Sequence, residues 1–250
     1  FIKDHNIADL LNSNIVVEGV LNGYELDHAT ALNLQGDEAY TEASIDLSDR
    51  DFTFEMWLNY TKPGTLIEHG VGQNRFKAEI TDDNKLRLTM GEKVITSDNA
   101  LLEDYWMYLA ISYDKSHETV NASYAYDATT VNLFENEAMA SYSGNGPLTV
   151  GKDMNVKMHE LTLWDENRNF VTSTSEMNTA KDPSTWNLIG YWPLDEGKGT
   201  VGADNARSRN LVLPANAWYL NNVNFAASFN GDNSYIKVNT SSIPVKDEQD

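Results

Sequence analysis

Carboxylate and histidine side chains are the groups that catalysis would need, and their positions in this chain form no catalytic pair. Retaining glycoside hydrolysis requires two carboxyl groups about 5 Å apart. None of the strands expected from the sequence carries such a pair, and Glu160 stands alone between His159 and Leu161. His159 and Glu160 do not form a zinc motif either, because Leu163 stands where the second histidine is required. The sequence therefore predicts no catalytic residue and no enzyme.

Aspartates could instead hold a calcium ion, which prefers oxygen ligands. Asp37 and Asp232 each follow a glycine in two similar turns, and they are the candidate metal ligands. The acidic stretch from Asp195 to Asp204 also offers oxygen atoms, but it lacks the alternating spacing of a calcium loop. Aspartates in turns also accept hydrogen bonds from nearby backbone N–H groups, which is the favoured role for any single one of them. A structural calcium ion remains the alternative to this turn role.

Tyrosines offer a candidate ligand-binding surface. Sugar binding uses aromatic rings as platforms, with polar neighbours that orient the hydroxyl groups. We take Tyr124, Tyr126 and Tyr142 as the candidate ligand-binding residues. Further aromatic candidates are Trp186, Tyr191 and Trp192. Aromatic residues on the strands of a sandwich more often belong to the core, as we expect for Trp57, Trp106 and Trp164.

Strands must position these side chains, and residues 51–60 form the central one. Phe52, Phe54, Met56 and Leu58 fall on one side of an extended chain. Trp57 breaks the alternation on the other side, which predicts that both faces are buried. Many further short strands follow at regular spacing, separated by turn residues, with one short helix expected from about Ser173 to Lys181. This pattern predicts an all-β fold, an antiparallel two-sheet jelly-roll sandwich.

The chain also repeats itself. Residues 34–40 recur as residues 229–235, an offset of 195 positions (229 minus 34), and Ala31 matches Ala226 in the same way. The first copy continues into the central strand, whereas the second stops before it. We therefore expect a lead-in at 1–14, a complete domain at 15–182 and the incomplete start of a second, similar domain at 186–250.

Four segments in fixed order resemble the laminin G-like and pentraxin-like domains of the concanavalin A-like lectin/glucanase superfamily. They are residues 34–40, 51–57, 106–114 and 148–164. Residues 190–204 look like the start of the next such domain. The resemblance implies a jelly roll in a secreted or surface multidomain protein that binds glycans or other proteins. It also implies that Glu160 anchors a loop, whereas the double-calcium site of pentraxin-like relatives is not carried over, because residues 152–155 offer too few oxygen ligands.

Composition limits the partners. The net charge of −20 argues against nucleic acid and anionic membranes, because both would repel the chain. No apolar run approaches the roughly 20 residues of a membrane helix, so we expect no membrane insertion. There are no cysteines, which excludes thiolate metal sites. The leading hypothesis is a non-catalytic recognition or adhesion module in an extracellular or cell-surface bacterial protein, with a glycan or a protein as ligand. The alternatives are a spacer or docking repeat that contacts secretion or anchoring machinery and, last, a glycoside hydrolase.

Overall fold

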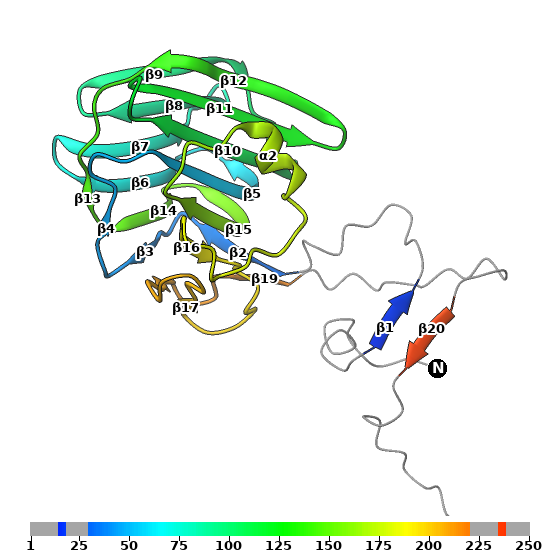
Figure 1. Cartoon of the computed structure of the whole chain (residues 1–250). Coiled ribbons are helices and arrows are strands. Elements are labelled where there is room, and N and C mark those ends of the chain that lie inside the picture. The colour runs from blue at the N-terminus through cyan, green and yellow to red at the C-terminus, as the bar shows by residue number, and fades with distance from the viewer. Residues whose placement is uncertain (1–14, 19–29, 221–234, 239–250) are drawn as a thin grey trace, which may run out of the picture. The chain divides into compact units, whose positions relative to one another are not determined.

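The chain folds into a sandwich of two antiparallel sheets, which confirms the predicted all-β class. The computed structural model describes residues 15–18, 30–220 and 235–238. The larger of two compact units is Thr30–Leu220. Figure 1 shows its two sheets packed face to face, with the short helix α2 (Phe170–Ser175) against one outer face. In the smaller unit, β1 (Ile15–Glu18) pairs with β20 (Tyr235–Val238).

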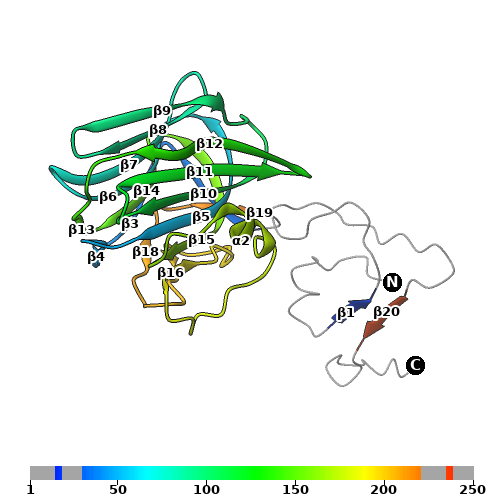
Figure 2. The ribbon, with the colours of Figure 1, turned by 45° about the horizontal axis from the view of Figure 1, so that its top comes forward.

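The first sheet is built around β5 (Phe52–Lys62). Antiparallel neighbours lie on both sides of it, β10 (Met107–Asp114) and β15 (Asn155–Trp164). The other strands extend the sheet outward: β11 (Thr119–Tyr126) and β12 (Thr129–Ala138) beyond β10, then β2 (Thr30–Gln35), β16 (Leu188–Trp192) and β19 (Trp218–Leu220) beyond β15. Figure 2 shows β12, β11, β10, β5, β15 and β16 in this order from top to bottom.

The second sheet runs in the order β17 (Val201–Gly202), β18 (Leu211–Val212), β3 (Ala39–Thr41), β14 (Leu148–Lys152), β6 (Thr65–Val71), β7 (Asn74–Ile80), β8 (Lys85–Met90) and β9 (Lys93–Ala100). Two short strands, β4 (Ile45–Asp46) and β13 (Asn145–Gly146), pair with each other. Strand β9 lies close to β12, and the side-chain amide of Asn99 donates a 2.8 Å hydrogen bond to the carbonyl oxygen of Asn132. This contact joins the two sheets at one edge.

Strand β5 is buried on both faces, as the break in its alternation predicted. Phe52 and Phe54 point between the sheets, and Phe54 stacks on Phe76 of the second sheet at 5.9 Å. Such aromatic pairs add about 0.5–1.5 kcal/mol beyond the burial of their area. The opposite face is covered by the chain after β15, where the indole N–H of Trp57 donates to the carbonyl oxygen of Met177 at 3.0 Å.

Helix α2 begins earlier than predicted. Asn169 is its N-cap, and the Asn169 side chain accepts the backbone N–H of Thr172 at 2.9 Å. The expected capping box does not form, because Ser173 donates its hydroxyl to Glu55 and Glu176 pairs with Arg168. Tertiary partners therefore outweighed the local spacing. In the described parts of the chain, no helix is long and apolar enough to cross a bilayer.

The limits of the larger unit correct the predicted domain boundaries. We expected the first domain to occupy 15–182 and a second to begin at 186, yet the compact unit is Thr30–Leu220. Residues 188–220 contribute β16, β17, β18 and β19 to its two sheets, because each of these strands has hydrogen-bonding partners there. The predicted lead-in at 1–14 lies outside the described residues, as do residues 221–234 and 239–250 of the predicted second domain.

Candidate functional site

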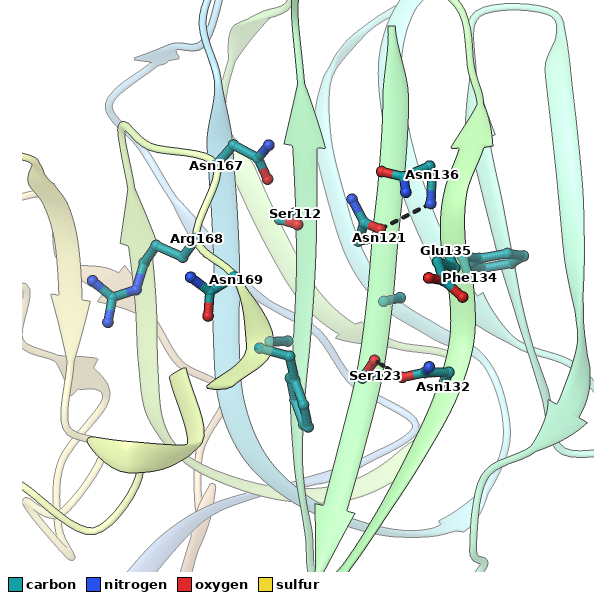
Figure 3. Close-up of a pocket in the computed structure, with 13 residues that line it drawn as sticks. Ser112, Asn121, Ser123, Asn132, Phe134, Glu135, Asn136, Asn167, Arg168 and Asn169 are labelled. Atoms are coloured by element: carbon teal, nitrogen blue, oxygen red, sulfur yellow. Dashed lines mark hydrogen bonds between the residues drawn. The ribbon is translucent and has the colours of Figure 1, made fainter. Parts of the chain in front are cut away.

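A hollow of about 360 Å³ lies on the outer face of the first sheet, beside α2. Strands β10, β11 and β12 form its floor, and residues 167–170 form one wall (Figure 3). Amides, hydroxyls and small side chains make up most of its lining: Ala110, Ser112, Asn121, Ala122, Ser123, Asn132, Phe134, Glu135, Asn136, Asn167, Arg168, Asn169 and Phe170.

The hollow exists because the floor carries small side chains. Ala110 and Ser112 occupy the outer face of β10, whereas Leu109 and Ile111, which alternate with them, point into the core. Ala110 lies directly opposite Ser123 of β11 in the antiparallel register. Neighbouring strands thus place short side chains side by side, and a large one at any of these positions would fill the space.

A bulge shapes the second half of the floor. The register of β11 against β12 shifts on both sides of Ala122, so Asn121 has no partner in the β12 ladder. Such bulges re-aim side chains. The side-chain oxygen of Asn121 accepts the backbone N–H of Asn136 at 2.8 Å (Figure 3), and Asn136 itself takes a left-handed backbone with φ of 48°.

The amides of the floor keep donors for a ligand. Ser123 donates its hydroxyl to the side-chain oxygen of Asn132 at 2.8 Å, as Figure 3 shows. The oxygens of Asn121 and Asn132 are therefore used within the protein. Among the described residues, no acceptor is hydrogen-bonded to the amide N–H₂ groups of these two side chains. Sugar hydroxyls both donate and accept hydrogen bonds, so they match such a surface.

The wall at 167–170 is fixed from behind by a buried carboxylate. Glu55 on β5 is fully buried, and it forms an ion pair with Arg168 at 2.9 Å. Arg168 also pairs with Glu176 at 2.6 Å and lies over the ring of Trp164. Burial by itself would lower the pKa of Arg168, but the two ion pairs outweigh burial and raise the pKa. In Figure 3 the guanidinium points away from the hollow, so its charge is not offered to a ligand.

Asp114, at the end of β10, fixes the same wall from the other side. Its carboxylate accepts a hydrogen bond from the side-chain amide of Asn167 at 3.2 Å. The hydroxyl of Ser116, and then the ring and backbone N–H of His117, lower the pKa of Asp114 to about 2. Asp114 is therefore ionised at any ordinary pH and holds Asn167 in place.

The three candidate tyrosines do not line this hollow, which corrects their expected role. Tyr142 is 2% exposed, and its hydroxyl group lies 2.7 Å from the ring nitrogen Nδ1 of His69. Tyr124 is 3% exposed and donates its hydroxyl to the carbonyl oxygen of Ala100. Both rings belong to the core, so neither offers a face to a sugar. Tyr126 is half-buried against the edge of Tyr105, away from the hollow.

The candidate metal ligands are not gathered into a site within the described residues. Asp37 is exposed in the turn after β2, and Asp232 lies outside those residues. No group of three or more potential ligand side chains from His, Cys, Asp or Glu was found in the described part of the chain. Asp204 accepts hydrogen bonds from four backbone N–H groups, those of Tyr191, Ala206, Arg207 and Arg209. Asp204 therefore serves to satisfy backbone N–H groups of the loop around it, as turn aspartates commonly do.

Glu160 anchors a neighbouring segment, as the family resemblance implied. It sits at a bulge of β15 with φ of 52°. Its carboxylate accepts the hydroxyl of Tyr191 at 3.0 Å, and its backbone N–H donates to the carbonyl oxygen of Pro193 at 2.9 Å. This pair holds the residues that follow β16 against β15.

The comparisons with known proteins support the fold. A family model described as the concanavalin A-like lectin/glucanases superfamily matches residues 34–170, and a search of curated proteins found no match. A Bacteroides ovatus protein provisionally described as carbohydrate binding has a similar structure, with a TM-score of 0.57 and 17% identity over 74% of this chain and 57% of its own. The extracellular region of zebrafish Gpr126/Adgrg6 has a TM-score of 0.52 and 14% identity, over 78% of this chain and 26% of its own.

A pentraxin from Limulus polyphemus is a more distant structural match, with a TM-score of 0.45, 11% identity, and coverage of 61% of this chain and 83% of its own. This chain spans little more than half of the Bacteroides ovatus protein. The family model covers more than half of the 250 residues, and its segment includes the strands that carried the resemblance. The chain belongs to the concanavalin A-like lectin/glucanases superfamily.

Proposed function

We propose that this chain is a non-catalytic recognition module that binds an uncharged glycan in the hollow beside α2. The observation that carries the proposal is the lining of the hollow, where five asparagines and two serines converge over a floor of small side chains. Pockets that bind small polar ligands place a few such groups to fix orientation. The structural likeness to the Bacteroides ovatus protein makes carbohydrate the first ligand class to test.

The charges around the hollow favour a neutral ligand. Among its thirteen lining residues Glu135 is the single carboxylate, so the hollow lacks the pair that hydrolysis requires. Arg168 is the single cation there, and its charge is taken by Glu55 and Glu176. With a net charge of −20, the chain repels sulfated or sialylated glycans. The proposal places the module outside the cell, where it would meet neutral glycans.

Phe170 supplies the apolar part of the site. It is half-buried at the start of α2 and lies on the wall above the floor. Sugars present C–H groups on one face of the ring, and an aromatic side chain can pack against that face. Amides on the floor and one aromatic side chain on the wall together match the two kinds of surface that a sugar has.

The test is a glycan array followed by calorimetry on the intact chain. We expect binding to neutral oligosaccharides and none to sialylated or sulfated ones. Asn132→Ala removes a floor amide and should weaken binding about tenfold, since one hydrogen bond contributes about 0.5–1.5 kcal/mol. Asn74→Ala, an exposed asparagine on β7 of the other sheet, is the matched control and should leave affinity unchanged.

The titration is run once with calcium chloride and once with EDTA, because a structural calcium remains a prediction. A glycan that binds equally well to the wild type and to Asn132→Ala would place the site elsewhere. No binding to any glycan would count against the glycan proposal and favour a protein ligand or a docking role.

A further inference from the structure

Residues 188–220, here called the closing segment, complete both sheets of the larger unit. Strand β16 pairs with the second half of β15, and β19 pairs with β2. On the other sheet β18 pairs with β3, and β17 pairs with β18. Without this segment, β2 and β3 would be open sheet edges, and open edges pair readily with other strands.

The closing segment is part of the core and not a loose addition. Trp192 is fully buried, and its indole N–H donates to the carbonyl oxygen of Arg209 at 3.0 Å. A Cβ atom on Gly190 would lie 2.4 Å from the ring of Trp192, so only glycine fits there. Leu194 and Leu211 are fully buried in the main cluster as well. These contacts make the segment a structural requirement of the unit.

By sequence, however, the closing segment leads into the second copy. The likeness between residues 34–40 and 229–235 extends further toward the amino terminus. Ala8 and Asp9 correspond to Ala203 and Asp204, also at an offset of 195. With one inserted residue, positions 15–17 (Ile, Val, Val) correspond to 211–213 (Leu, Val, Leu). The chain therefore contains two versions of this segment, one before each copy, and the downstream version occupies the edges of the first copy.

The smaller unit repeats the same kind of pairing. Tyr235 and Ile236 of β20 are the counterparts of Tyr40 and Thr41, at the offset of 195. In the larger unit Leu211 pairs with Thr41 and Val212 with Tyr40. In the smaller unit β1, from the upstream version of the segment, also pairs antiparallel with β20, in a register shifted by two residues, so that Val17 rather than Ile15 lies opposite Ile236. In both units, therefore, β3 or its counterpart β20 pairs with a segment that leads, in the sequence, into the other copy.

We propose that the closing segment completes a copy other than the one it leads into, so that tandem copies interlock by exchanging edge strands. The partner of the β2 and β3 edges is thus the chain of a neighbouring repeat. The closing segment is recognised by backbone pairing along β15, β3 and β2 and by its buried side chains Trp192, Leu194 and Leu211.

Engineered disulfides in the full chain test which version of the segment lies against β3. Tyr40 and Val212 are direct partners, and opposite residues of antiparallel strands lie about 4.5–5.5 Å apart, within reach of a disulfide. The chain has no cysteine, so Tyr40→Cys with Val212→Cys forms the single possible bond. The matched control pairs Tyr40→Cys with Val16→Cys, the sequence counterpart of Val212. Peptide mapping of the oxidised proteins should find an intramolecular bond in the first variant and free thiols in the second.

A bond in the control, no bond in the first variant, or a bond between two chains would each overturn the proposal. A second measurement uses thermal unfolding followed by tryptophan fluorescence. Leu211→Asp should lower the melting temperature of the larger unit by about 10 °C, because an unpaired charge replaces a buried leucine. Ile15→Asp, at the counterpart position, should shift it by less than about 2 °C. The reverse order of effects would show that the upstream version closes the unit.

Discussion

Glu55 is the side chain that ties the central strand to the wall of the hollow. Besides Arg168, its carboxylate accepts the phenol of Tyr108 and the indole N–H of Trp164, both at 3.0 Å. Its charge is fully buried, so each of these partners compensates for water that was removed. Tyr108 is affected in turn: burial and the nearby Glu55 carboxylate raise the pKa of its phenol.

Glu55→Gln should be strongly destabilising although it keeps the shape of the side chain. The amide cannot neutralise Arg168, and breaking a buried ion pair costs about 3–5 kcal/mol. The free energy of unfolding in urea measures the loss. Glu176→Gln removes the other carboxylate on Arg168, but Glu176 is 44% exposed and its loss should cost less than about 1 kcal/mol. Equal costs would contradict a special role for Glu55.

His69 should make stability depend on pH. Its Nε2 lies 2.9 Å from the carbonyl oxygen of Ile45, which can only accept, so Nε2 carries the proton and Nδ1 faces the Tyr142 hydroxyl. Burial lowers the pKa of His69 below 6.5, despite the hydrogen bond to Ile45. Between the folded-state pKa and 6.5 the unfolded chain binds more protons, so stability is lost as pH falls below 6.5.

Urea unfolding at a series of pH values measures this dependence. In the His69→Gln variant the curve between pH 7 and the folded-state pKa should be flatter than in the wild type, because no imidazole titrates. Curves that stay parallel would show that His69 does not contribute.

The hairpin of β6 and β7 depends on two glycines in different ways. Gly70 has φ of 82°, and a Cβ there would lie 2.2 Å from the backbone oxygen of Asn74. Gly72 has φ of 59°, but nothing lies within 4 Å of its added Cβ. Gly70→Ala should therefore cost about 2–4 kcal/mol and Gly72→Ala only about 1 kcal/mol. Thermal denaturation of both variants checks the order; a larger effect at Gly72 would refute the explanation.

Local pattern was enough to predict most of the individual strands. Residues 51–60 were expected as a strand buried on both faces, and they became β5. The end of the domain was not predictable in this way, because β16 is recognised by its pairing with β15 and by nothing within its own residues. The sequence likeness of 190–204 to the start of a domain in fact favoured the opposite assignment.

The hollow was missed for a related reason. The search for aromatic platforms led to Tyr124 and Tyr142, whose rings fill the core. The floor is instead marked by the lack of bulky groups, as at Ala110 and Ser112. Its asparagines come from β11, β12 and the loop before α2, and only the sheet register brings them together. The frequency of asparagine in those three segments was the one signal that could have pointed there.

Charge acts on the molecule as a whole. A net charge of −20 means that acidic groups repel one another in the folded state. Salt screens this repulsion, and the Debye length falls from about 30 Å at 0.01 M to about 8 Å at 0.15 M. The melting temperature should therefore rise by a few degrees when sodium chloride is added over this range, as differential scanning calorimetry can measure. A fall would mean that the surface ion pairs, such as Lys77 with Glu79, outweigh the repulsion.

Thr30 and Leu220, the two ends of the larger unit, are register partners in the pairing of β2 with β19. The polypeptide thus enters and leaves this body of 191 residues (30 to 220) at points only about 5 Å apart. The folded unit therefore adds almost nothing to the end-to-end distance of the polypeptide. A pulling force applied at both ends would separate β19 from β2 from this end of the pair, and their hydrogen bonds would break one after another. The unit should therefore unfold at a low pulling force, and its unfolding would release the extended length of 191 residues.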